Sequence, residues 1–180
     1  MQFYIRFGEI ESFITKKLEN VRKTIMVKIG LLGAGRVIQS RYMEVFKQEL
    51  KDVSVLIVCD KVKTSADKVA SILECQAVYN DELLFKNSEI DTILIATESG
   101  NHYEHAKRAL EKGKHVIVEK PPAFNPEEIL NNEKFAKEKG LMFAVIFQNR
   151  LNPAIQILKK TYDDGRFGKL VLATIRVRTN

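Results

Sequence analysis

The strongest constraint on the fold is a glycine-rich turn between a short apolar run and a stretch with helical spacing. It reads Gly30-Leu31-Leu32-Gly33-Ala34-Gly35-Arg36-Val37-Ile38. The run over 26–32 predicts a strand, and the pattern over 36–50 predicts a helix. In a dinucleotide-binding turn the first glycine permits the bend, and the second lets the backbone approach a diphosphate. The backbone amides at the start of the helix then face the negative charge of this diphosphate. Ile38 replaces the third glycine of the usual pattern, so the motif is incomplete. We expect cofactor contacts from Gly33, Ala34, Gly35, Arg36 and Val37.

The rest of the chain alternates predicted strands and helices with short joints. We predict strands over 53–59, 77–79, 92–96, 115–118 and 141–147, and helices over 65–73, 81–85, 102–112, 126–139 and 153–162. The strands are mostly continuous apolar runs, as expected for strands buried on both faces. Six such strands with intervening helices predict an α/β fold with a Rossmann-type, doubly wound parallel sheet.

Three segments follow from these patterns. Residues 1–25 have apolar side chains at helical spacing, which indicates an N-terminal helical extension or a stretch upstream of a true start at Met26. Residues 26–150 form the predicted dinucleotide-binding domain. Residues 151–180 are expected to begin an incomplete second α/β domain. Its first strand, over 169–178, alternates apolar and polar residues as in an open antiparallel sheet.

Composition narrows the function classes. Of the 180 residues, 45% are hydrophobic and 29% charged, as in a soluble globular protein. The net charge of +6 comes from scattered Lys and Arg beside acidic residues, so we expect no nucleic-acid partner. Cys59 and Cys75 lack metal-binding spacing, which indicates free thiols, no metal site and a cytoplasmic location. No apolar run approaches the ~20 residues of a membrane span.

Asp60 follows the second strand at the place where an acid accepts hydrogen bonds from the adenosine ribose. A carboxylate there repels a 2′-phosphate, so the sequence favours NAD over NADP. Lys61 and Lys63 keep NADP open as an alternative, because a nearby cation can accommodate the phosphate.

The loop after the fourth strand, Thr97-Glu98-Ser99-Gly100-Asn101-His102, is expected to line the cofactor crevice. We predict cofactor contacts from Thr97, Glu98 and His102, although Glu98 or His102 could instead cap the following helix. His105 is expected on a surface face of that helix, and His115 to be structural within its strand.

Polar residues also follow the fifth and sixth strands. Glu119-Lys120-Pro121-Pro122 places a lysine beside the expected dinucleotide, where it can exchange a proton with a substrate hydroxyl. Pro121 allows a cis peptide that would aim Lys120 inward. We therefore predict Lys120 as catalytic, with Glu119 and Lys120 as cofactor contacts. In Gln148-Asn149-Arg150 we expect Gln148 to contact the cofactor, and Asn149, Arg150 and Lys120 to bind substrate. The alternative for Arg150 is an ion pair with a neighbouring acid.

Taken together, Gly33-Ala34-Gly35, Asp60, Thr97-x-x-x-x-His102 and Glu119-Lys120-Pro121 resemble the glucose–fructose oxidoreductase and inositol dehydrogenase (Gfo/Idh/MocA) family. Ser99-Gly100-x-His102 and Gln148-Asn149-Arg150-x-Asn152-Pro153 are similar to its branch that oxidises the 3-hydroxyl of UDP-N-acetylglucosaminuronic acid. The resemblance implies an NAD-binding domain, followed by an open-faced α/β domain that holds a sugar or nucleotide-sugar and mediates homo-oligomerisation. Lys120 matches the family's lysine, whose partner from the second domain has no position here. Glu98 departs from the proline usual after the threonine.

We therefore expect the amino-terminal part of an NAD-dependent oxidoreductase that acts on a sugar CH–OH group. The alternative is a non-catalytic dinucleotide-binding module or remnant.

Overall fold

The computed structural model describes residues 26–47, 50, 52–174 and 176, so the helix predicted within residues 1–25 lies outside its described part. The chain forms two units, Met1–Ile146 and Phe147–Asn180, whereas the sequence placed a domain boundary after residue 150.

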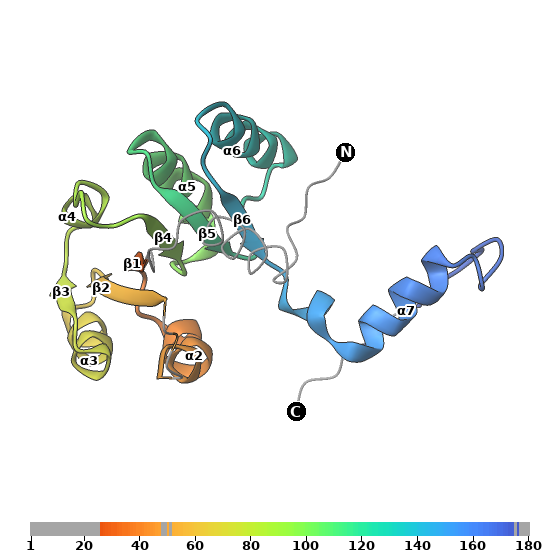
Figure 1. The fold of residues 1–180 in the computed structure, drawn as a ribbon, viewed down its shortest axis with the longest axis horizontal. Helices are drawn as coiled ribbons and strands as arrows, with labels where there is room; N and C mark the ends of the chain where they lie inside the picture. Colours follow the sequence, from red (N-terminus) through yellow and green to blue (C-terminus); the bar gives the residue numbers. More distant parts are fainter. Residues whose placement is uncertain (1–25, 48–49, 51, 175, 177–180) are drawn as a thin grey trace. The chain divides into compact units, whose positions relative to one another are not determined.

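The first unit alternates strands and helices in the predicted order (Figure 1). Its strands are β1 (Val27–Leu32), β2 (Val53–Cys59), β3 (Gln76–Val78), β4 (Thr92–Ile95), β5 (His115–Glu119) and β6 (Phe143–Ile146). Its helices are the π-helix η1 (Ile38–Tyr42), α2 (Met43–Lys47), α3 (Lys63–Leu73), α4 (Asp81–Phe85), the 3₁₀ turn η2 (Ser99–Asn101), α5 (His102–Glu111) and α6 (Pro126–Glu138). The six predicted strands are confirmed, with ends that differ by one or two residues.

All six strands are parallel and lie in the order β3-β2-β1-β4-β5-β6. The chain runs outward from β1 in one direction, then returns to β4 on the other side of β1. In such a doubly wound sheet, ligands bind outside the carboxyl ends of the strands at this switch between β1 and β4. The predicted Rossmann fold is confirmed.

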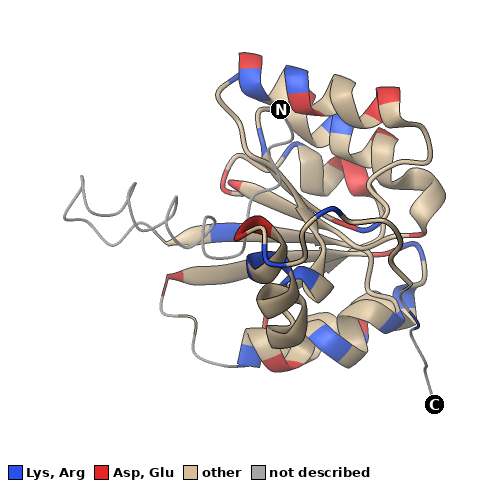
Figure 2. Cartoon of the chain, turned by 90° about the vertical axis from the view of Figure 1, so that its right-hand side faces the viewer, with Lys and Arg blue, Asp and Glu red and all other residues tan. Residues whose placement is uncertain are grey.

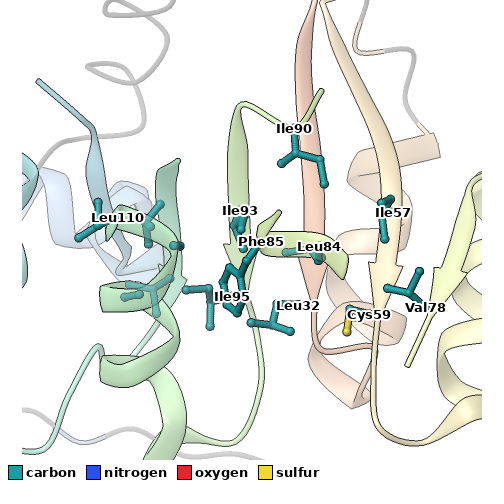
Figure 3. Close-up of a cluster of buried hydrophobic side chains, with 14 of the residues drawn as sticks. Leu32, Ile57, Cys59, Val78, Leu84, Phe85, Ile90, Ile93, Ile95 and Leu110 are labelled. Atoms are coloured by element: carbon teal, nitrogen blue, oxygen red, sulfur yellow. The ribbon is translucent and has the colours of Figure 1, made fainter. Parts of the chain in front are cut away.

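A hydrophobic layer covers each face of the sheet. On one face, Leu84 and Phe85 of α4 and Leu110 of α5 pack against strand side chains such as Ile93 and Ile95 (Figure 3). On the other face, Ile38 and Met43 pack with Ala66, Val69 and Ala70 of α3 against β1 and β2. Figure 1 shows α2 and α3 on one side of the sheet and α5 and α6 on the other. Burial on both faces explains why the strands are continuous apolar runs.

The helix predicted over 36–50 is described as far as Lys47, and its middle turns are a π-helix. The start of α6 agrees with the sequence signals. The side chain of Asn125 accepts a hydrogen bond from the amide of Glu127 at 2.9 Å, and Pro126 occupies the first helical position, where no intrahelical donor is needed.

The second unit contains the 3₁₀ turn η3 (Gln148–Leu151) and the predicted helix α7 (Pro153–Asp163), capped by the side chain of Asn152. The strand predicted over 169–178 is wrong for its described part: residues 169–174 and 176 are not in a strand. A strand needs a neighbour to satisfy its backbone donors and acceptors. Among the described residues, no second strand of this unit offers that pairing.

Acidic and basic residues are interspersed on the helices (Figure 2). Lys86 pairs with Glu82 at 2.9 Å one turn apart, and Arg108 of α5 pairs with Asp81 at 2.6 Å. No helix in the described part of the chain is long and apolar enough to cross a membrane.

Candidate functional site

Gly33 brings the ends of β1 and β4 together. Its φ is +99°, a conformation that side chains other than glycine rarely adopt, and its amide donates to the carbonyl of Cys59 at 2.8 Å. A Cβ at Gly33 would lie 2.6 Å from the carbonyl oxygen of Ala96 and 2.9 Å from the amide nitrogen of Thr97. The position therefore needs glycine both for its turn and for the close approach of a second strand end.

Neither the backbone conformation nor the packing at Gly35 requires a glycine. Its φ is not positive, and a Cβ there would meet no atom within 4 Å. The residue is exposed at the start of a helix, as are Arg36 and Val37. Amides in a first helical turn have no acceptor inside the helix and favour an anion. The open backbone at Gly35 fits the approach of a dinucleotide diphosphate.

Asp60 is fixed beside this turn by two backbone amides. Its Oδ2 accepts from the amide of Ala34 at 2.7 Å, and its Oδ1 accepts from the amide of Val62 at 2.8 Å. The amide of Ala34, predicted as a cofactor contact, is therefore used within the protein. Each carboxylate oxygen keeps acceptor capacity for a further donor, such as a ribose hydroxyl.

His102 joins the loops after β4 and β5. Its ring is 1% exposed, with Nδ1 at 2.7 Å from the carbonyl oxygen of Pro121 and Nε2 at 2.9 Å from that of Thr97. Both ring nitrogens thus face carbonyl oxygens of the protein, so His102 joins the two loops. Its predicted contact with a cofactor stays a prediction. Glu98 is exposed, and its side chain accepts a hydrogen bond from Asn101.

His105 lies one turn later on the same face of α5. The prediction of a surface position is wrong: its side chain is 12% exposed, and Nδ1 lies 3.0 Å from the hydroxyl oxygen of Thr97. On the other side of the ring, Nε2 lies 4.0 Å from Asp81, which Arg108 grips with two hydrogen bonds of 2.6 and 3.1 Å. Burial lowers the pKa of His105, and the opposing effect of Asp81 is smaller. The spacing of three residues from His102 was the sequence signal for this position.

Glu119 and Tyr42 connect β5 to the helix of the glycine turn. The Tyr42 hydroxyl donates to Oε1 of the buried Glu119 at 2.6 Å, and Oε2 accepts from the amide of Lys120 at 3.2 Å. Burial and the hydrogen bond to Glu119 raise the pKa of Tyr42. The sequence analysis missed Tyr42, because its partner lies 77 residues away.

Lys120 is exposed at the carboxyl end of β5, and its bond to Pro121 is cis, as the sequence allowed. Gln148, Asn149 and Arg150 belong to the second unit, where the Arg150 guanidinium lies 5.5 Å from the centre of the Phe147 ring. Their predicted contacts with cofactor and substrate stay predictions. In the first unit, by contrast, direct contacts link the ends of β1, β2, β4 and β5 into one edge.

Comparison with known proteins identifies the family of this chain. Residues 27–147 match the family model described as "Oxidoreductase family, NAD-binding Rossmann fold" (GFO_IDH_MocA). The chain belongs to this family. The resemblance drawn from the motifs is confirmed, and the glycine turn, Asp60, Thr97 and Lys120 all lie inside the matched segment.

Several relatives are sugar or inositol dehydrogenases. The chain is 27% identical to D-glucoside 3-dehydrogenase of Escherichia coli, over 83% of this chain and 43% of that protein. It is 29% identical to the scyllo-inositol 2-dehydrogenase (NADP(+)) IolW of Bacillus subtilis, over 82% of this chain and 40% of that protein. Among solved structures, the WlbA dehydrogenase from Bordetella pertussis in complex with NADH and UDP-GlcNAcA has a TM-score of 0.74 and 27% identity, over 81% of this chain and 43% of that one. The chain thus spans less than half the length of these relatives.

Proposed function

We propose that the carboxyl edge of the first unit binds NAD, as the cofactor part of an oxidoreductase that acts on a hydroxyl of a sugar or nucleotide-sugar. The observation that carries the proposal is Gly35, where neither backbone conformation nor packing calls for glycine. Its open backbone beside the first helical turn suits a diphosphate, because unpaired amides and the helix dipole attract negative charge.

The arrangement around Asp60 favours NAD over NADP. Two backbone amides hold its carboxylate in place, so it cannot easily swing aside to admit a 2′-phosphate. Lys63, one of the two cations that could compensate, lies 5.1 Å from the centre of the Tyr79 ring and has a partner there. Lys61 remains exposed next to Asp60.

Lys120 is the proposed proton acceptor. NAD bound at this edge would supply the oxidising power by accepting a hydride from the substrate carbon. The amine of Lys120 would take the hydroxyl proton, so that the alcohol becomes a ketone and no other reactant is consumed. The amide of Lys120 is held by the buried Glu119, which fixes the backbone from which the amine reaches the substrate. Asn149 and Arg150 are proposed to bind the substrate.

The WlbA complex makes UDP-N-acetylglucosaminuronic acid the first substrate to test, with its 3-hydroxyl as the reacting group. We expect the chain to bind NAD measurably in calorimetric titration, and more tightly than NADP. Asp60→Ala should reduce that preference, because it removes the charge that opposes a 2′-phosphate. A wild-type chain that binds neither dinucleotide would contradict the proposal.

Turnover is tested separately, with Lys120→Met as the variant. The NAD affinity and the rate of NADH formation are both measured, and at saturating NAD the rate should fall by about 10²–10⁴-fold, the usual contribution of a proton-transfer residue. The matched control is Lys112→Met. Lys112 is an exposed lysine at the carboxyl end of α5, so its replacement should leave the NAD affinity and the rate of NADH formation unchanged.

A second candidate function is dinucleotide binding without catalysis. Saturable NAD binding without detectable turnover of any sugar or nucleotide-sugar would support this second candidate.

A further inference from the structure

Two histidines, one helical turn apart on α5, contact the same residue. His102 meets the carbonyl oxygen of Thr97 at 2.9 Å, and His105 meets its hydroxyl oxygen at 3.0 Å. Thr97 follows β4 and its amide nitrogen lies against Gly33, the first glycine of the dinucleotide turn. A half-buried threonine at the proposed cofactor edge is thus held both by its backbone and by its side chain.

The surroundings of His105 decide which ring nitrogen carries the proton. Four charged groups influence the ring: Asp81 of α4 and Glu98 of the loop after β4 favour its charged form, whereas Arg108 of α5 and Lys61 disfavour it. Burial outweighs each of them and lowers the pKa, so the ring is neutral at neutral pH. The negative Asp81 lies on the Nε2 side at 4.0 Å, which favours the proton on Nε2 and leaves the lone pair on Nδ1.

We propose that His105 is a positioning residue whose Nδ1 accepts a hydrogen bond from the Thr97 hydroxyl, so that Thr97 presents only acceptor lone pairs to a bound dinucleotide. This inference rests on the cofactor site proposed above. A hydroxyl has one proton to donate, and the lone pair of Nδ1 uses it. Arg108 fixes Asp81 through two hydrogen bonds, which hold the Asp81 carboxylate 4.0 Å from Nε2 of His105.

The direction of this hydrogen bond determines whether the Thr97 hydroxyl accepts a hydrogen bond from the ligand or donates one to it. A ribose hydroxyl or the amide of the nicotinamide carboxamide can donate to its free lone pairs. When His105 becomes protonated, Nδ1 turns into a donor, and the Thr97 hydroxyl then points its own proton toward the ligand instead. The ligand therefore binds the neutral form of His105 better, and affinity is lost as pH falls through the lowered pKa of this histidine.

The first test needs no ligand. Nitrogen-15 NMR of the full chain, with the His105 signals assigned by their loss in His105→Asn, shows which imidazole nitrogens carry protons. We expect a proton on Nε2 and none on Nδ1 at pH 8. A proton on Nδ1 under these conditions would overturn the proposal, whether or not the chain binds NAD.

The second test measures the affinity for NAD⁺ by calorimetry as the pH is lowered, alongside the protonation of His105 followed by NMR. Wild type should lose affinity in step with that protonation. His105→Asn retains an acceptor near the Nδ1 position but does not titrate, so it should keep the affinity seen at high pH without this loss. His105→Leu should bind about three- to tenfold more weakly at every pH, the effect of one hydrogen bond. Adding His105→Leu to the matched variant Thr97→Val should cause little further loss, because both changes remove the same contact.

Absence of NAD⁺ binding by wild type at high pH would refute the cofactor site itself. Binding that is intact at high pH and declines equally in wild type and His105→Asn would refute the role of His105 alone.

Discussion

Gly33 and Gly35 stand two residues apart in one turn and are glycine for different physical reasons. Gly33 has a left-handed backbone and no room for a Cβ against the end of β4. Gly35 has an ordinary backbone and open space around its Cα. One glycine serves the fold, and the other fits the proposed ligand, so substitutions can separate stability from binding.

Gly33→Ala should lower the free energy of unfolding by about 2–4 kcal/mol, because it combines an unfavourable φ with a backbone clash. Gly35→Ala should leave stability within about 0.5 kcal/mol of wild type. The same Gly35→Ala should weaken NAD binding by about tenfold, close to 1.4 kcal/mol, since the new methyl group occupies the diphosphate approach. Urea unfolding and calorimetric titration measure the two effects. An unchanged NAD affinity in Gly35→Ala would argue against a diphosphate at this turn.

Residues predicted from local motifs lie at the expected strand ends, and those that depend on distant contacts were missed. Gly33 and Asp60 could be placed because the strand and turn signals lie next to them. Tyr42 gives no local sign of its role, since it acts on a carboxylate brought close only by the order of the sheet. His105 was predicted on a surface face of its helix, yet its side chain faces Thr97.

At the scale of elements, the helix of the glycine turn is tied to β5 through the bond between Tyr42 and Glu119. The carboxylate of Glu119 is buried, so it depends on its two donors, the Tyr42 hydroxyl and the Lys120 amide. Removal of one donor leaves a carboxylate oxygen of Glu119 without a hydrogen-bond partner. Burial of such an oxygen away from water lowers the stability of the folded chain.

Tyr42→Phe should destabilise the chain by about 1.5–3 kcal/mol, the range for hydrogen bonds to charged groups. The ring and its stacking on Phe46, at 6.2 Å between centroids, are retained, so the loss reports on the hydroxyl. Tyr79→Phe is the matched control. Its hydroxyl also donates to a carboxylate, that of Asp67 at 2.7 Å, but at an exposed site, where the loss should stay below about 1 kcal/mol. Equal losses in the two variants would mean that burial of Glu119 adds nothing.

Helices and strands could be predicted from the sequence where the local pattern of apolar residues matches the way the segment is buried in the fold. The strands of the sheet are continuous apolar runs, which suit burial on both faces, and each formed where expected. The strand predicted over 169–178 had a good alternating pattern, but an alternating pattern specifies only one face. Pairing must come from a neighbouring strand, and the described part of the second unit supplies none.

At the scale of the whole molecule, the two units differ in how much side-chain surface they bury. The first unit contains both hydrophobic clusters. In the second unit, none of the described residues is buried, and α7 exposes Ile157 by 67% and Leu158 by 47%. A helix of this length is marginal in water without tertiary packing. The first unit should therefore carry nearly all of the stability of the chain.

A chain ended after Phe147 should consequently unfold within about 2 °C of the full chain, a shift no larger than the roughly 2–4 °C that 1 kcal/mol produces in a chain of this size. Amide exchange should show the same division, with β1 and β4 protected to the level of global unfolding and α7 exchanging through local opening. A chain ended after Gly140 provides the control. It lacks β6, which pairs with β5 and includes the buried Ala144, so its midpoint should fall sharply. If truncation after Phe147 lowered the midpoint as much as loss of β6, the second unit would be an integral part of the folded core, and its exposed apolar helix would need a packing partner within this chain.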